Sequence, residues 1–161
     1  MEPPCRPAPV ILKWLRCLLI SLVFLAACGP PAPPGAAADP TRESWYAQST
    51  RELAGLDRQA EAEFAAGKSD DAAALIEKGQ PIEKKLVSVN HPTLEAVEAA
   101  SDLDDLYGRM LLKNRHYGWA RLMFQKNLSR WRHWSPQTEE SKKRYQRAAA
   151  EIEQCDQEMT R

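Results

Sequence analysis

The chain has 161 residues, and its 22 lysine and arginine residues balance 22 aspartate and glutamate residues. About 120 residues follow a proline-rich stretch near the N-terminus, which allows one compact domain and leaves little room for two. Three of the four cysteines lie within the first 28 residues, so Cys155 has no partner in the remainder of the chain. This excludes a domain held by its own disulfide and requires one held by packing.

Residues 1–27 have the composition of an export signal. Arg6, Lys13 and Arg16 supply positive charge, and the eleven residues 17–27 are uncharged and mostly apolar. A helix of that length spans about 16 Å, roughly half of a hydrocarbon core, so a permanent transmembrane helix is the weaker interpretation.

The signal ends in Leu25-Ala26-Ala27-Cys28, which resembles the lipobox of bacterial lipoproteins. The resemblance implies cleavage before Cys28, acylation of that cysteine, and attachment to a membrane outside the cytoplasm. Gly29 stands where an aspartate marks inner-membrane retention in such lipoproteins, which favours the outer membrane if the organism has one. An ordinary secretory signal with an incidental cysteine is the alternative.

The acylated cysteine would be followed by a tether. Residues 29–40 are mostly proline, glycine and alanine with a single charge, a composition that cannot build a core. We therefore expect a signal peptide over 1–27, the acylated cysteine and tether over 28–40, and a helical domain over 41–161.

The first two predicted helices come directly after the tether. Apolar residues at steps of three and four predict a helix over about 41–66, which Gly67 ends. Ser69-Asp70 is expected to cap the second helix. Because proline lacks a backbone donor, we expect a kink or break between Gly79 and Pro81.

Three more helices are predicted in the second half. Pro92 is expected in the first turn of the third helix, which ends near Asn114. The fourth carries an apolar stripe from Tyr117 to Trp131. Ser135-Pro136 is expected to start the fifth, whose stripe includes Cys155 as a buried free thiol. Short connections favour antiparallel neighbours.

Similar openings recur 52 and 44 residues apart: Asp39-Pro40-Thr41, His91-Pro92-Thr93 and Ser135-Pro136-Gln137-Thr138. The segment between the last two resembles a tetratricopeptide repeat of the kinesin-light-chain type, which the His-Pro-Thr start and the long spacing favour. Its signature positions are occupied by Gly108, Tyr117, Ala120 and Phe124. The resemblance implies an all-α fold of antiparallel helical hairpins, stacked as a short tetratricopeptide-like array with a C-terminal capping helix. Asp104 departs from the pattern, which commonly has a large residue there. A plain five-helix bundle is the alternative.

Charge is divided along the chain. Residues 106–147 contain eleven basic and two acidic residues, whereas residues 41–105 contain seven basic and fourteen acidic residues. The expected location outside the cytoplasm argues against nucleic acid as the partner of the basic, aromatic segment. The basic half could instead face the acidic half, lie against anionic lipid, or line a groove for a protein or peptide partner.

The resemblance also implies a partner-binding site. The first helix of each pair lines the concave face in such repeats, and the matching positions here are Asp105, Arg109, Leu112 and Lys113. Arg109 and Lys113 lie one turn apart, so both could hold a partner's carboxylate. Two solvated cations are the alternative.

Motifs of catalysis or metal binding are missing from the sequence, which contains no HExxH, GxSxG or phosphate-binding glycine loop. We expect no enzyme activity, no cofactor and no metal. The predicted function is a membrane-anchored exported lipoprotein that acts as a protein-protein interaction or scaffold module in the cell envelope. The alternative is a structural helical lipoprotein that binds anionic lipid or an envelope polymer through residues 106–147.

Overall fold

Helices account for almost all of residues 39–161, the part of the chain that the computed structural model describes. The elements are a 3₁₀ turn η1 (Pro40–Arg42) and the helices α2 (Ser44–Ala65), α3 (Ser69–Val87), α4 (Leu94–Lys113), α5 (Tyr117–His133) and α6 (Glu139–Met159). No strand occurs in this part, which confirms the all-α class. The predicted signal, Cys28 and the tether up to residue 38 lie outside the described residues.

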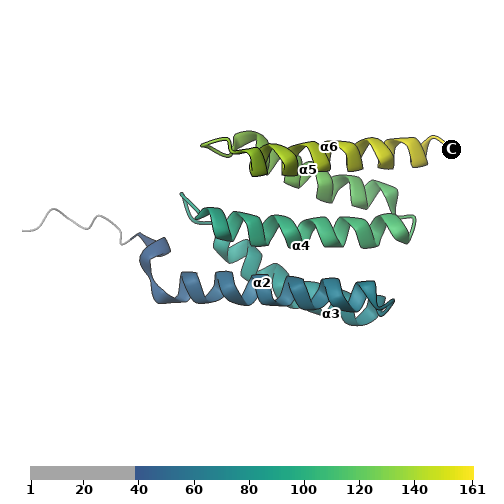
Figure 1. Cartoon of the computed structure of the whole chain (residues 1–161). Coiled ribbons are helices and arrows are strands. Elements are labelled where there is room, and N and C mark those ends of the chain that lie inside the picture. Colours follow the sequence, from purple (N-terminus) through teal and green to yellow (C-terminus); the bar gives the residue numbers. More distant parts are fainter. Residues whose placement is uncertain (1–38) are drawn as a thin grey trace, which may run out of the picture. The chain divides into compact units, whose positions relative to one another are not determined.

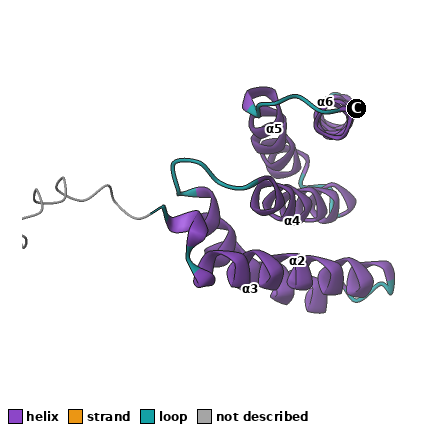
Figure 2. Cartoon of the chain, turned by 60° about the vertical axis from the view of Figure 1, so that its left-hand side comes forward, coloured by secondary structure: helices purple, strands orange, loops and turns teal. Residues whose placement is uncertain are grey.

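The helices form two layers. Helices α2, α4 and α6 lie side by side in the nearer layer of Figure 1, and α3 and α5 lie behind them. Successive helices run antiparallel, so α2 pairs with α3 and α4 pairs with α5, and α6 closes the stack (Figure 2). The predicted array of antiparallel hairpins with a C-terminal helix is confirmed. We call the exposed side of α2, α4 and α6 the front face.

The two hairpins have the same turn. Gly67 and Arg115, whose residue numbers differ by 48, both adopt positive φ, at 80° and 60°. In each turn the next amide, that of Lys68 or His116, donates to a carbonyl of the preceding helix at 2.9 Å. Only glycine adopts this conformation without strain, so the second hairpin repeats the first at a small cost at Arg115.

Small residues let the two helices of the second hairpin approach closely. Gly108 on α4 faces Phe124 on α5, and a Cβ atom at position 108 would come within 2.5 Å of the Phe124 ring. Phe124 and Ala120 are fully buried. The first hairpin has the fully buried Ala60 and Ala72 at the positions 48 residues earlier, so both hairpins cross through small residues.

A buried tyrosine joins the first hairpin to the second. The Tyr46 hydroxyl donates to the Leu86 carbonyl at the end of α3, at 3.3 Å. The same oxygen accepts the amide hydrogen of Thr93, just before α4, at 3.2 Å. Because Tyr46 is only 1% exposed, its ring and hydroxyl hold α2, α3 and α4 at one point of the core.

Helix α6 ends the stack with a polar outer surface. It packs against α5 through the buried Ala148 and Cys155, and Cys155 has no disulfide partner among the described residues. The buried thiol predicted at this position is thus confirmed. Most exposed positions of α6 are polar: Lys142, Lys143, Gln146, Glu153, Gln154 and Gln157. Helical repeat arrays commonly end in an element with such a polar outer face.

Of the kink or break predicted between Gly79 and Pro81, the break is wrong. Helix α3 runs without interruption from Ser69 to Val87. Pro81 is exposed, so water can reach the carbonyl that its missing N–H leaves unpaired. Beyond it, the buried Glu83 and Leu86 hold the last turns in the stack. The expected cap is also wrong, because Ser69 is the first helical residue and Lys68 precedes it without a side-chain cap.

Two helices start later in the chain than their prolines led us to predict. Helix α4 begins after Thr93, whose hydroxyl accepts the Ala96 amide at 3.4 Å, and Pro92 precedes this cap. Helix α6 begins after Thr138, which forms a reciprocal capping box with Ser141, so Ser135-Pro136 belongs to the loop. Threonine satisfies a free amide of the first turn, which proline cannot do, and so decides where each helix starts.

A glycine pair tests the close approach of α4 and α5. Gly108→Ala should lower the free energy of unfolding by about 2 kcal/mol, because the new methyl overlaps the fixed Phe124 ring. Gly55→Ala, in open space in the middle of α2, should raise it by about 1 kcal/mol through helix propensity. Urea denaturation followed by circular dichroism measures both. Equal gains in the two variants would show that the contact at Gly108 is not tight.

Candidate functional site

Acidic residues of the first half of the domain pair with basic residues of the second half. On the front face these pairs join α2 to α4 and α4 to α6, and we call this group the charged seam. Its members are Asp57, Glu61, Asp102, Asp105, Arg109, Arg144, Arg147 and Glu151. The expectation that the basic half faces the acidic half therefore agrees with the ion pairs of the structure.

Arg109 is the central cation of the charged seam. Its two terminal nitrogens lie 3.1 and 2.6 Å from the two carboxylate oxygens of Glu61 on α2. Its Nε donates to Asp105 at 3.0 Å, and Asp105 also pairs with Arg147 of α6 at 3.3 Å. A guanidinium with two carboxylate partners has little capacity for a third.

In each of two carboxyl groups of the charged seam, one buried oxygen has no hydrogen-bond donor. Asp57 Oδ1 and Glu151 Oε2 are buried and accept no hydrogen bond within residues 39–161. Burial, together with the negative charges of Asp102 and Glu61, raises the pKa of Asp57 to about 6. Burial and the neighbouring Asp105 raise the pKa of Glu151 to about 8. Glu151 therefore carries a proton at neutral pH, and the charged seam holds fewer negative charges than its sequence suggests.

A second group of charges lies between α3, α4 and α5, and we call it the rear cluster. Glu83 and Asp104 are buried, and each pairs with both Lys126 and Arg130 at distances from 2.6 to 3.1 Å. Burial and the nearby Asp104 raise the pKa of Glu83. Ion pairs rather than apolar contacts therefore surround the buried Asp104 at this boundary.

The rear cluster extends into a buried hydrogen-bond network. Asn127 donates to the Ser101 carbonyl at 2.9 Å, and the Trp131 indole donates to the Ser101 hydroxyl at 2.8 Å. Arg130 donates to the Asn127 side-chain oxygen. Since Ser101, Asn127 and Trp131 are each at most 2% exposed, these bonds fix the position of α5 against α4.

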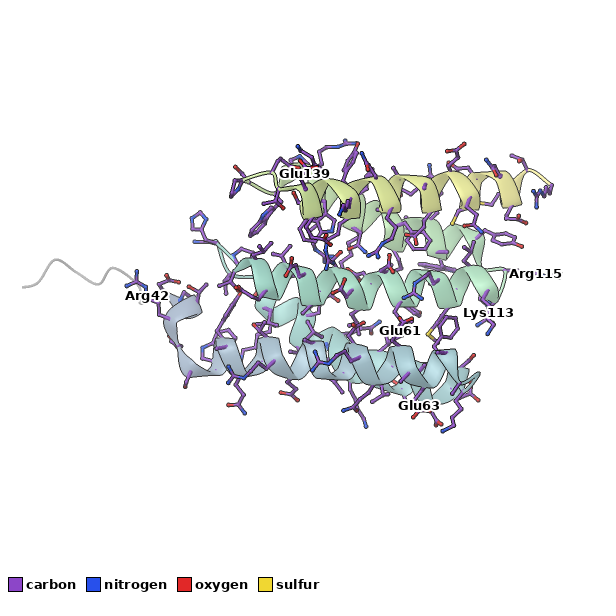
Figure 3. The ribbon with its side chains drawn as sticks, viewed as in Figure 1. Arg42, Glu61, Glu63, Lys113, Arg115 and Glu139 are labelled. Atoms are coloured by element: carbon purple, nitrogen blue, oxygen red, sulfur yellow. The ribbon has the colours of Figure 1, made fainter. Side chains whose placement is uncertain are left out.

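The four residues predicted to bind a partner have different surroundings. Asp105 is buried and paired with Arg109, and Leu112 packs against the core around Phe124 and Cys155. Lys113 is exposed at the end of α4, with its Nζ 4.8 Å from the centre of the Phe64 ring. Figure 3 shows Lys113 beyond Glu61 along the boundary of α2 and α4. The site stays a prediction, but Arg109 is already occupied by carboxylates of its own chain.

Sequence reasoning missed the residues that complete the charged seam. Glu61 and Arg109 occupy equivalent positions of the two hairpins, 48 residues apart, and could have been paired by aligning the shared turns. Glu151 and Arg147 could not be found in this way, because within residues 39–161 no turn like those at Gly67 and Arg115 follows α6. Their place follows only from how α6 packs on α5.

A hollow of about 510 Å³ lies between the α3–α4 and α5–α6 loops. Its lining includes His91, His133, Trp134 and Arg130. The Arg130 side chain is only 12% exposed and is bound to the rear cluster, so it offers the hollow little charge. Within residues 39–161 no three His, Cys, Asp or Glu side chains are grouped to hold a metal ion. No helix in this range is long and apolar enough to cross a bilayer.

No family model, no curated protein and no solved structure matches this chain. Its functional interpretation therefore depends on its own residues.

Removing Arg130 tests the rear cluster. Arg130→Leu should lower the free energy of unfolding by about 3 kcal/mol, because Glu83 and Asp104 would remain buried with Lys126 alone. Arg132→Leu is the control, since Arg132 is exposed two residues away on the same helix. The loss of unfolding free energy in Arg132→Leu should be much smaller. Chemical denaturation of both variants gives the comparison, and similar losses would show that the buried ion pairs do not stabilise the stack.

Proposed function

We propose that this protein is a lipid-anchored, exported interaction module of the cell envelope. The sequence Leu25-Ala26-Ala27-Cys28 supports the anchor, and the helical array supports the module. The observation that carries the proposal is the front layer, in which α2, α4 and α6 follow one another (Figure 1) and carry charged side chains at their boundaries. Stacked helical hairpins commonly bind partners along such a face.

The tetratricopeptide-like identity is part of the same proposal. It is supported by the repeated turn at Gly67 and Arg115 and by the small residues where the paired helices cross. It is also supported by the two-layer arrangement, in which the first helix of each hairpin lies in the front layer. The unequal repeat spacing and Asp104 remain departures from the pattern.

The alternative function, binding of anionic lipid or an envelope polymer through residues 106–147, has less support. Most basic side chains of this segment are neutralised inside the fold: Arg109, Arg121, Lys126, Arg130, Arg144 and Arg147 have acidic partners. A polyanion site needs free cations on one surface. We therefore propose a protein or peptide as the partner, and we do not assign its chemical character.

The anchor is tested by metabolic labelling with palmitate. The wild-type chain should incorporate the label and fractionate with membranes, and Cys28→Ala should lose both properties. A Cys28→Ala protein that still carries the label would contradict the lipoprotein assignment. A protein that is exported without any label would indicate an ordinary secretory signal.

The interaction face is tested by site-specific photo-crosslinking in the native envelope. A crosslinker in place of Lys113 on the front side should give a discrete protein adduct that depends on Cys28. The same crosslinker in place of Gln80, exposed on the rear helix α3, is the matched control and should give none. Adducts of equal strength from both positions, or lipid adducts that disappear as salt is raised, would contradict the proposal.

A further inference from the structure

Glu151 and Asp105 form a pair of carboxyl groups across the boundary between α6 and α4. The Asp105 side chain is 7% exposed and receives Arg109 on one oxygen and Arg147 on the other. Glu151 lies one turn after Arg147 and within hydrogen-bonding reach of Asp105, and its Oε2 is buried. Two carboxyl groups share a hydrogen bond only when one of them carries a proton.

The carboxyl groups of Glu61, Asp105 and Glu151 outnumber the cations that reach them, Arg109 and Arg147. From α4 it faces Asp105 and Arg109, and from its own helix it faces Arg147. Beyond these, α2 places Glu61 and Asp57 beside Arg109 and Asp105. Arg109 is bound by Glu61 and Asp105, and Arg147 is bound by Asp105. This geometry favours a neutral Glu151, in agreement with its pKa of about 8.

Helix α6 is held in two different ways. Against α5 it buries Cys155 beside Ala120 and Phe124, and the Arg144 guanidinium lies 5.3 Å from the Trp131 ring. At the front face it meets α4 through the ion pairs Arg144–Asp102 and Arg147–Asp105. The contact with α5 thus combines apolar packing with the ion pair Arg121–Asp156, whereas the front contact consists of charged groups around Glu151.

We propose that a proton shared by Glu151 and Asp105 holds the front edge of α6 against α4, and that loss of this proton opens the charged seam. Ionised Glu151 would face Asp105 across a poorly solvated boundary, where Arg109 and Arg147 already pair with Asp105. Like charges in that position repel more strongly than at an exposed surface. The shared proton lies within the helical array itself. The proposal therefore goes beyond the proposed function and requires neither the lipid nor a partner.

The proton makes stability depend on pH in a definite direction. The ordinary pKa of the Glu151 carboxyl is 4.5, and the folded protein raises it to about 8. Between these values the folded chain binds a proton that the unfolded chain has released. The stabilisation is therefore complete below the lower value, falls as the pH rises through this window, and is lost above the upper one.

The direct test is a titration of the side-chain carboxyl carbons by nuclear magnetic resonance in the full chain, purified in mild detergent. Glu151 should titrate with a midpoint near pH 8. This measurement uses the wild-type protein and so does not depend on whether a variant folds. A midpoint in the ordinary range of a glutamate overturns the proposal.

Two variants on α6 test the structural consequence. From pH 6 to pH 9 the wild-type Tm should fall by about 3 °C or more, and Glu151→Gln should flatten this dependence. Glu153→Gln, two residues away and exposed, should follow the wild type.

Hydrogen exchange locates the change along the chain. At pH 9 the amides of residues 147–155 should exchange about tenfold faster in the wild type than in Glu151→Gln, and at pH 6 the two should agree. Comparison at one pH removes the effect of base on intrinsic exchange. Equal exchange at pH 9, or a Tm profile of Glu151→Gln that matches the wild type, overturns the proposal.

Discussion

Pairing between an acidic first half and a basic second half is the interaction on which the stack depends. Glu83, Asp104 and Asp105 are buried at the boundaries between helices, where an unpaired carboxylate would be costly. Lys126, Arg130, Arg109 and Arg147 reach them from helices that come later in the sequence. The acidic and basic segments of the chain therefore face each other in the fold, and their attraction helps to determine which helices are neighbours.

This pairing coexists with very close apolar contacts. Gly108 against Phe124 and Gly79 against Leu103 bring helices nearer than ordinary side chains allow, and Tyr46 holds three elements at one point. Close packing at these crossings leaves the charged groups at the edges of the helices. The consequence is a molecule with two apolar cores and two polar boundaries, of which only the charged seam reaches the front face.

Helix number, order and approximate bounds were predictable because each helix has one apolar stripe and a marked end. Helix starts were less predictable, since Pro92 and Pro136 suggested starts that Thr93 and Thr138 decide. The sequence shows that charge is divided along the chain. It does not show which acidic residue pairs with which basic residue, because a pair such as Arg109–Glu61 depends on the register of two helices. Glu151 was unpredictable, since its environment comes from three helices at once.

The polar outer side of α6 has a consequence for behaviour at high density. A protein confined to a membrane plane, as proposed here, meets copies of itself far more often than one that diffuses in solution. Stacked helical arrays can lengthen end to end when a terminal helix exposes an apolar stripe to the next molecule. The lysine, glutamine and glutamate side chains on the outer side of α6 remove that stripe, so crowding should not drive filament growth from this end.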